Sequence, residues 1–346
     1  MDWGGNLYYG VYLKWNYDDG YVDTKMPGYV MKQVKKYKHI LQKRRHTPLQ
    51  PLPRKYGKAA QEPTPADTSK PLNKEDTKLV EQVVGSFLFY GRAVDPIILH
   101  ALNTIANDQN NPTENTLIQV KNFLDYMHTY PDATIRYYAS DMILNVHSDA
   151  SYLTAPKARS RIGGHFFLGK IPVDGKPIFL NGPILSLCTV LRTVAASAAE
   201  AELGALFHNA KEAKVIRLIL EELGHPQPPT PIHIDNTTVT GIVNNTIKRQ
   251  RSRSMEMKYF WLLDQKIQRL FKFCYHPGFE NLGDLYTKAH TGKDTQHKRP
   301  FYVHTPKSPR YLTRSQLPHI RRGCVGTSRD SLSHIGTRKL NRTYGS

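Results

Sequence analysis

From residue 133 onward, short strand-like runs alternate with longer helical ones, and this alternation most constrains the fold. Strands are predicted at 135–149, 161–170, 178–190, 231–235 and 270–276. Helices are predicted at 198–223, 237–245, 254–268 and 281–289, and Gly224 and Pro226 end the first of them. Three strands followed by alternating helices and strands predict a mixed, five-stranded α/β sheet flanked by helices over residues 133–290.

The rest of the chain divides into four segments with different patterns. Residues 1–41 predict a strand pair and a basic amphipathic helix, and residues 42–72 are rich in Pro, Lys and Arg and predict a linker. Residues 73–132 carry three helical patterns that predict a small bundle. Residues 291–346 are basic and polar, so we expect a tail that is disordered or ordered only on a partner.

The charge balance points to a polyanionic partner. Lys and Arg outnumber Asp and Glu by 48 to 29, a formal net charge of +19. Without a visible membrane anchor, nucleic acid is the commonest partner of such a chain, and the alternative is a basic protein whose cations are merely solvated. The three cysteines form no C-x-x-C pair, which excludes a cysteine zinc site and suits a reducing compartment. With no bilayer-length apolar run and no signal-peptide core, we expect an intracellular protein, cytoplasmic or nuclear, that is not secreted and has no membrane partner.

Four carboxylates lie at predicted strand ends or helix starts: Asp149, Glu200, Asp235 and Asp284. If they converge, they repel one another unless a divalent cation lies between them. Oxygen ligands without His or Cys favour Mg²⁺ or Mn²⁺, and two such ions about 4 Å apart can hydrolyse a phosphodiester. Each acid also has a plainer interpretation, since Asp149 and Asp235 can be N-caps, Glu200 can stabilise a helix dipole and Asp284 can be exposed.

The residues around these acids resemble the RNase H domain of Ty1/copia-type retrotransposon polyproteins. The matching segments, in the family's order, are Ser148-Asp149-Ala150-Ser151-Tyr152, Ser197 to Leu206, Asp235-Asn236, Arg253 to Phe260 and Asn281 to Lys288. The resemblance covers about residues 135–290. It continues upstream, where residues 85–96 resemble the helical connection between reverse transcriptase and RNase H, and residues 1–40 resemble the stretch after the polymerase active site.

The resemblance implies a role for each acid. Asp149, Glu200, Asp235 and Asp284 would be the first to fourth ligands of two Mg²⁺ ions, or of Mn²⁺. Glu202 is the nearest rival of Glu200, but the family's Ser-Ser-Thr-Glu-Ala-Glu sequence assigns the ligand to the first Glu. Because the two face different sides of a helix, only one can point at the metal ions.

Further candidates would assist catalysis or hold nucleic acid. His276 could help proton transfer or product release, or be only a polar strand-end residue. Phosphate contacts are predicted for a dense basic cluster at residues 248–253. This cluster could instead be a solvated loop or a nuclear-import signal. Asn236 and the start of the second predicted strand are also candidates to touch a nucleic acid. The basic candidates are Lys248, Arg249, Arg251, Arg253, Arg159 and Arg161.

The implied function is a ribonuclease H that cleaves the RNA strand of RNA–DNA hybrids by two-metal hydrolysis. We expect a fragment without the reverse transcriptase catalytic motif and without polymerase activity, because the nearest match, Tyr17-Asp18-Asp19-Gly20, has the wrong order. Its expected partners are the hybrid and the reverse transcriptase portion of the polyprotein. One alternative is a catalytically decayed remnant that still binds nucleic acid, since Gly283 stands where the family more often has Ala. Another is a transposase or integrase nuclease, which needs an Asp-Asp-Glu trio and usually a zinc-binding segment.

Overall fold

The computed structural model describes residues 4–51, 62, 65, 67–171, 173, 176–247 and 253–312, without the side chains of residues 253–255. Its main sheet has the strand order β10-β9-β5-β6-β8. β5 pairs in parallel with β9, and β9 with β10, whereas β5–β6 and β6–β8 are antiparallel. These strands are β5 (Ile143–Ala155), β6 (Arg159–Gly169), β8 (Pro183–Val190), β9 (Thr230–Ile234) and β10 (Phe271–Tyr275). The prediction of a mixed, five-stranded α/β sheet is confirmed.

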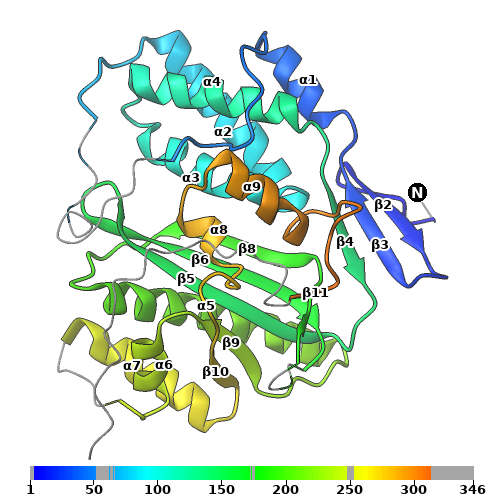
Figure 1. Ribbon diagram of the computed structural model, residues 1–346, viewed down its shortest axis with the longest axis vertical. Coiled ribbons are helices and arrows are strands. Elements are labelled where there is room, and N and C mark those ends of the chain that lie inside the picture. The colour runs from blue at the N-terminus through cyan, green and yellow to red at the C-terminus, as the bar shows by residue number, and fades with distance from the viewer. Residues whose placement is uncertain are drawn as a thin grey trace, which may run out of the picture.

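Helices cover both faces of this sheet (Figure 1). On one face lie α1 (Tyr29–Lys36), α2 (Lys74–Ala93), α3 (Leu99–Asp108) and α4 (Glu114–Thr129), with a 3₁₀ turn, η2 (Pro96–Ile98), before α3. On the other lie α5 (Ala198–Glu222), α6 (Thr237–Val243) and α7 (Arg253–Ile267). No helix among the described residues is both long and apolar enough to cross a membrane.

Helix α5 packs on the sheet and directs polar side chains toward it. Ser197 caps its start by accepting a hydrogen bond from the backbone N of Glu200, and Gly224, at a φ of 86°, follows its end. Its apolar side chains pack on the sheet with Leu144, Val146 and Phe166 in one buried cluster. Burying this face fixes the rotation of α5 about its axis, and thereby the direction of every polar side chain on it.

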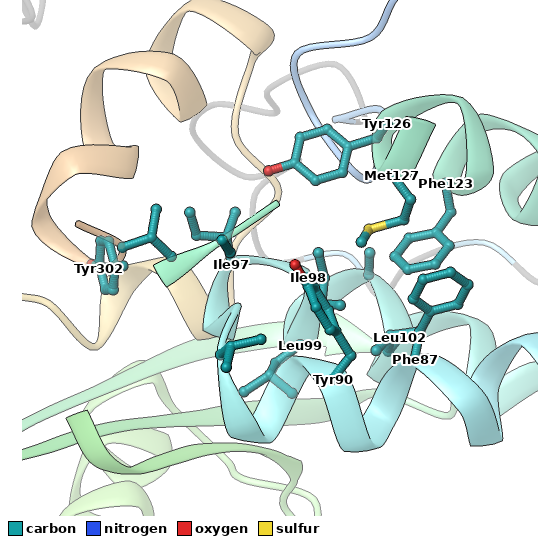
Figure 2. Close-up of a cluster of buried hydrophobic side chains, with 14 of the residues drawn as sticks. Phe87, Tyr90, Ile97, Ile98, Leu99, Leu102, Phe123, Tyr126, Met127 and Tyr302 are labelled. Carbon is teal, nitrogen blue, oxygen red and sulfur yellow. The ribbon is translucent and has the colours of Figure 1, made fainter. Parts of the chain in front are cut away.

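Helices α1 to α4, called the helical unit below, share a hydrophobic core with the face of the sheet that they cover. Phe87, Leu102 and Phe123 come from α2, α3 and α4, and Tyr302, from the chain after the sheet, extends their cluster (Figure 2). Phe167 of β6 belongs to the same cluster. The helices predicted at 73–132 are therefore present and pack on one another as a bundle, and this bundle shares its core with the sheet.

The predicted strand 135–149 is two strands in two sheets. β4 (Thr134–Tyr138) closes a small antiparallel sheet with β1 (Leu7–Tyr8), β2 (Val11–Asn16) and β3 (Tyr21–Lys25). Met142, at a φ of 57°, interrupts the extended chain before β5. β4 is held on β3 by Arg136, whose guanidinium donates two hydrogen bonds to Asp23. Similarly, the predicted strand 178–190 is divided into β7 (Ile178–Phe179) and β8.

Residues 291–312 are ordered, which corrects the prediction of a disordered tail from residue 291. They form α9 (Gly292–Lys298), a 3₁₀ turn η3 (Arg299–Phe301) and β11 (Tyr311–Leu312), which pairs with β7. The predicted helix 281–289 is shorter, α8 (Asp284–Thr287). Buried Arg299 explains the order, because it donates to the Tyr126 hydroxyl at 2.8 Å and lies 3.4 Å from Asp95. Residues 313–346 lie outside the described part of the chain.

Candidate metal centre

Three carboxylates meet where strand β9 ends beside the middle of β5. Ligand atoms of Asp149, Glu202 and Asp235 all lie within 4.8 Å of one another. Asp149 is on β5 and Asp235 directly follows β9, and these parallel neighbours are in register up to the pair Ser148 and Ile234. Asp149 lies in the middle of β5, directly after the point where its pairing with β9 ends, and Asp235 leaves β9 at the same point, so the two Asp residues are adjacent. Glu202 comes from the second turn of α5.

Glu200 is not part of this group, and the prediction that chose it over Glu202 is corrected. Its Oε2 accepts a hydrogen bond from the backbone N of Ala196 at 2.9 Å, so the side chain folds back on the helix start. Glu202 instead shares the sheet-facing side of α5 with buried Leu206 and Asn209, four and seven residues further on. The same spacing is visible in the sequence, so helical periodicity could have identified Glu202 where the family's sequence pattern did not.

Burial makes the charged forms of two of these acids costly. It raises the pKa of Asp149 to about 7, against the opposing effect of Lys288 and with a further contribution from Asp284 and Asp235. Burial, together with the charges of Asp149 and Asp235, raises the pKa of Glu202 well above its usual value. Both side chains are almost fully buried, at 0% and 8% exposure.

The donor set fits a divalent cation. Among the described residues, Asp149 Oδ1 and Glu202 Oε2 are buried oxygens without a hydrogen-bond partner. An unpartnered buried carboxylate oxygen is unfavourable unless a proton or a cation satisfies it. Carboxylate oxygens alone, without His or Cys in the group, suit Mg²⁺ or Mn²⁺.

The fourth predicted acid, Asp284, lies beside the group and is held by cations. Its Oδ1 is 2.6 Å from Lys288 Nζ, and its Oδ2 is 2.5 Å from Lys298 Nζ and 3.4 Å from His290 Nε2. Burial alone would raise the pKa of Asp284, but the charges of Lys288 and Lys298 outweigh it and hold that pKa well below its usual range. Lys288 also lies 3.6 Å from Asp149 Oδ2 and so connects Asp284 to the other acids. Sequence reasoning gave no role to either lysine or to His290.

Close backbone packing fixes the position of Asp149. A Cβ on Gly283 would lie 2.9 Å from the Asp149 Cβ, and a Cβ on Gly163 would collide with the Gly283 carbonyl. α8 can therefore lie directly against β5 and β6. Thr287 Oγ1 donates to Asp149 Oδ2, and Asn281 Nδ2 donates to the Ser148 carbonyl at 2.8 Å. Gly283, which departs from the family pattern, suits this close contact.

His276 lies in a group of histidines rather than among the three clustered carboxylates. It follows β10, and its ring centroid is 5.3 Å from that of His147 and 5.2 Å from that of His233. Its Nε2 is 3.2 Å from Glu280 Oε2. Its predicted role in catalysis stays a prediction.

The predicted nucleic-acid contacts are only partly within the described residues. Arg161 is 2% exposed, and its Nη1 donates to Asn103 Oδ1 of α3, so the prediction that it touches nucleic acid is corrected. Arg161 thus points toward α3, and Arg159, two residues earlier on β6, is half-buried. Asn236 caps α6 by accepting from the backbone N of Val239 at 3.1 Å, beside Asp235. Lys248, Arg249 and Arg251 and the side chain of Arg253 lie outside the described structure.

Known proteins similar to this chain include retrotransposon polyproteins. No family model matches it. The retrovirus-related Pol polyprotein from transposon TNT 1-94 of Nicotiana tabacum is 24% identical over 206 residues, which are 60% of this chain and 15% of that protein. The transposon Ty1-JR2 Gag-Pol polyprotein of Saccharomyces cerevisiae is 22% identical over 254 residues, 70% of this chain and 14% of that protein. The curated relatives are thus Ty1/copia-type Pol polyproteins at modest identity, and the chain spans a small part of their length.

Solved structures similar to the chain are RNase H domains. LC11-RNase H1, isolated from compost, is 14% identical, with a TM-score of 0.31 over 42% of this chain and 93% of that one. Its complex with an RNA/DNA hybrid is 13% identical, with a TM-score of 0.30 over 42% and 92%. The fold assignment above rests on the strand order and pairing directions of the five-stranded sheet.

Proposed function

We propose that this chain is a ribonuclease H-type hydrolase that cleaves the RNA strand of RNA–DNA hybrids and depends on Mg²⁺ or Mn²⁺. The observation that carries the proposal is the group of Asp149, Glu202 and Asp235, within 4.8 Å of one another where β9 ends beside its parallel neighbour β5. Relatedness to Pol polyproteins and the five-stranded sheet support the same reaction class.

The chain's own residues prepare this group for cations. β5, β9 and α5 hold the three carboxylates on rigid elements, and Thr287 orients Asp149 through its Oδ2. That leaves Asp149 Oδ1 and Glu202 Oε2 as the buried oxygens that would hold a divalent ion, with Asp235 as the third donor. Bound ions would supply an activated water and stabilise the leaving oxygen of the phosphodiester.

The RNA–DNA hybrid is the proposed substrate, and the reverse transcriptase portion of a polyprotein is a proposed partner. Asn236 next to Asp235 and half-buried Arg159 remain proposed contacts to the hybrid. The proposal does not extend to polymerisation, because Asp18 and Asp19 lie exposed in the turn between β2 and β3.

A cleavage assay with matched Glu variants tests the proposal. The purified chain is incubated with a hybrid labelled on its RNA strand, with Mg²⁺ or Mn²⁺. We expect Asp149→Asn and Glu202→Gln each to reduce the rate by about 100-fold or more, beyond the cost of losing an outer-shell partner. Glu200→Gln, two residues away on α5, keeps its acceptor for Ala196 and should stay within about threefold of wild type. Absence of cleavage at every metal concentration, or an unaffected Asp149→Asn, rejects the proposal.

A second candidate is a nucleic-acid-binding remnant that no longer cleaves. The observation in its favour is that two ammonium groups contact Asp284. Retention of the hybrid in a gel-shift assay without metal-dependent turnover would select this function.

A further inference from the structure

Both oxygens of Asp284 are in contact with lysine ammonium groups. Lys288 Nζ lies 2.6 Å from Oδ1 and Lys298 Nζ lies 2.5 Å from Oδ2, both within charge-assisted hydrogen-bond distance. The Asp284 side chain is 14% exposed, so water screens these contacts only in part. A divalent ion that used Asp284 as a ligand would therefore have to displace at least one ammonium group.

Lys288 reaches into the carboxylate group as well. Its Nζ is 3.6 Å from Asp149 Oδ2, whereas Asp149 Oδ1 has no hydrogen-bond partner. One ammonium group thus lies between the fourth acid and the three clustered acids. Its charge compensates Asp149 and Asp284 together, which is the electrostatic task that a second metal ion would otherwise perform.

Lys298 lies in a segment, residues 290–299, that is held in place at both ends and so positions its ammonium group at Asp284. It is the last residue of α9, and the next residue, Arg299, donates to the Tyr126 hydroxyl and lies 4.7 Å from the centre of the Tyr130 ring. At the start of the segment, the His290 carbonyl accepts a hydrogen bond from Thr47 Oγ1 at 2.9 Å. Figure 1 shows α9 between the helical unit and the sheet. The backbone on either side of Lys298 is therefore fixed.

We propose that Lys288 and Lys298 form a cationic clamp on Asp284. This chain then binds one divalent ion readily, and it binds a second only after at least one of the two ammonium groups has moved away from Asp284. The first ion would use Asp149, Glu202 and Asp235, and two oxygens of this group, Asp149 Oδ1 and Glu202 Oε2, are buried without a hydrogen-bond partner. The second requires Asp284 and competes with two positive charges. This inference rests on the proposed metal-dependent function and adds that metal occupancy is limited by the chain itself.

Counting bound Mn²⁺ tests the clamp without any substrate. The full chain is titrated with Mn²⁺, and free Mn²⁺ is followed by electron paramagnetic resonance. We expect wild type to bind a first ion and then a second at least about tenfold more weakly, since two ammonium charges oppose the second. Lys298→Met should increase the affinity for the second ion about tenfold or more and change the affinity for the first ion by less than about threefold.

Three further variants separate the clamp from other effects. Lys298→Arg keeps the charge and should behave as wild type, whereas Lys288→Met should tighten the second ion as Lys298→Met does. Lys293→Met removes an exposed charge from the same helix and should change neither ion. The clamp is overturned if wild type binds two ions with equal affinity. It is also overturned if Lys298→Met has a native circular dichroism spectrum and an unchanged affinity for the second ion. Because binding is measured without hybrid, the clamp can stand in a chain that fails to cleave, and fail in one that cleaves.

Discussion

Replacing Asp149 by Asn should stabilise the metal-free protein, and by more at high pH than at low pH. Asp149 is fully buried, and its pKa is raised from the ordinary 3.8 to about 7. Asn keeps an oxygen that can accept from Thr287 Oγ1 but carries no charge beside Glu202 and Asp235. The substitution therefore removes the electrostatic cost while preserving the contact that orients the side chain.

The direction and size of the effect follow from the two pKa values. A group whose pKa is raised on folding gives its stability contribution fully below the unfolded value, near pH 4, and loses it as the pH rises through the folded value, near 7. A tenfold change in an equilibrium constant is about 1.4 kcal/mol, so wild type should lose up to about 4 kcal/mol across this range. The Asp149→Asn variant should lack this loss.

Urea denaturation in EDTA at pH 5 and pH 8 measures the difference. The free energy of unfolding of Asp149→Asn, relative to wild type, should be larger at pH 8 by a few kcal/mol. Asp141→Asn removes an exposed carboxylate eight residues earlier and serves as the control, with no such pH dependence expected. If the two proteins differ equally at both pH values, burial of a charged Asp149 is not what destabilises the metal-free site. When EDTA is replaced by saturating Mg²⁺, wild type should be stabilised and the variant should not, because the ion binds only the folded carboxylate group.

Two further predictions concern the packing that supports the site. Gly283→Ala should destabilise the chain by about 1–3 kcal/mol in urea denaturation, since its Cβ would press on Asp149 at 2.9 Å, whereas Gly85→Ala, in the open middle of α2, should not destabilise it. Arg299→Met should cost about 3–5 kcal/mol, because it leaves buried Asp95 without this partner. In the second variant, limited proteolysis should cut the segment from α9 to β11 first, and loss of all regions together would contradict the anchoring role.

The sequence predicts the central sheet and two of its acids because both depend on local patterns. Asp149 and Asp235 each follow an apolar run, and β5 and β9 are neighbouring parallel strands in register up to these two residues. The choice between Glu200 and Glu202 depends on which side of α5 faces the sheet, and buried Leu206 and Asn209 fix that side. A family sequence pattern alone does not contain this information, whereas the helical period does.

Other features depend on contacts that no local pattern reveals. The strand predicted at 135–149 runs through the break at Met142, so the separate sheet of β4 follows only from its pairing with β3. The order of residues 291–312 arises because Arg299 meets Asp95, 204 positions earlier in the chain. A basic, polar segment without periodicity predicts disorder unless such a distant partner is known.

The same distant contact connects the helical unit to the acidic residues. Asp95 and Tyr126 belong to the segment that precedes the sheet, and they hold Arg299 in place. Arg299 directly follows Lys298, whose ammonium contacts the fourth acid. A change in the packing of the helices against the sheet would therefore shift Lys298 relative to Asp284 before it disturbed the three clustered carboxylates, which are held by β5, β9 and α5. Because the two regions also share one apolar core, residues 73–132 and the sheet should unfold as a single cooperative unit.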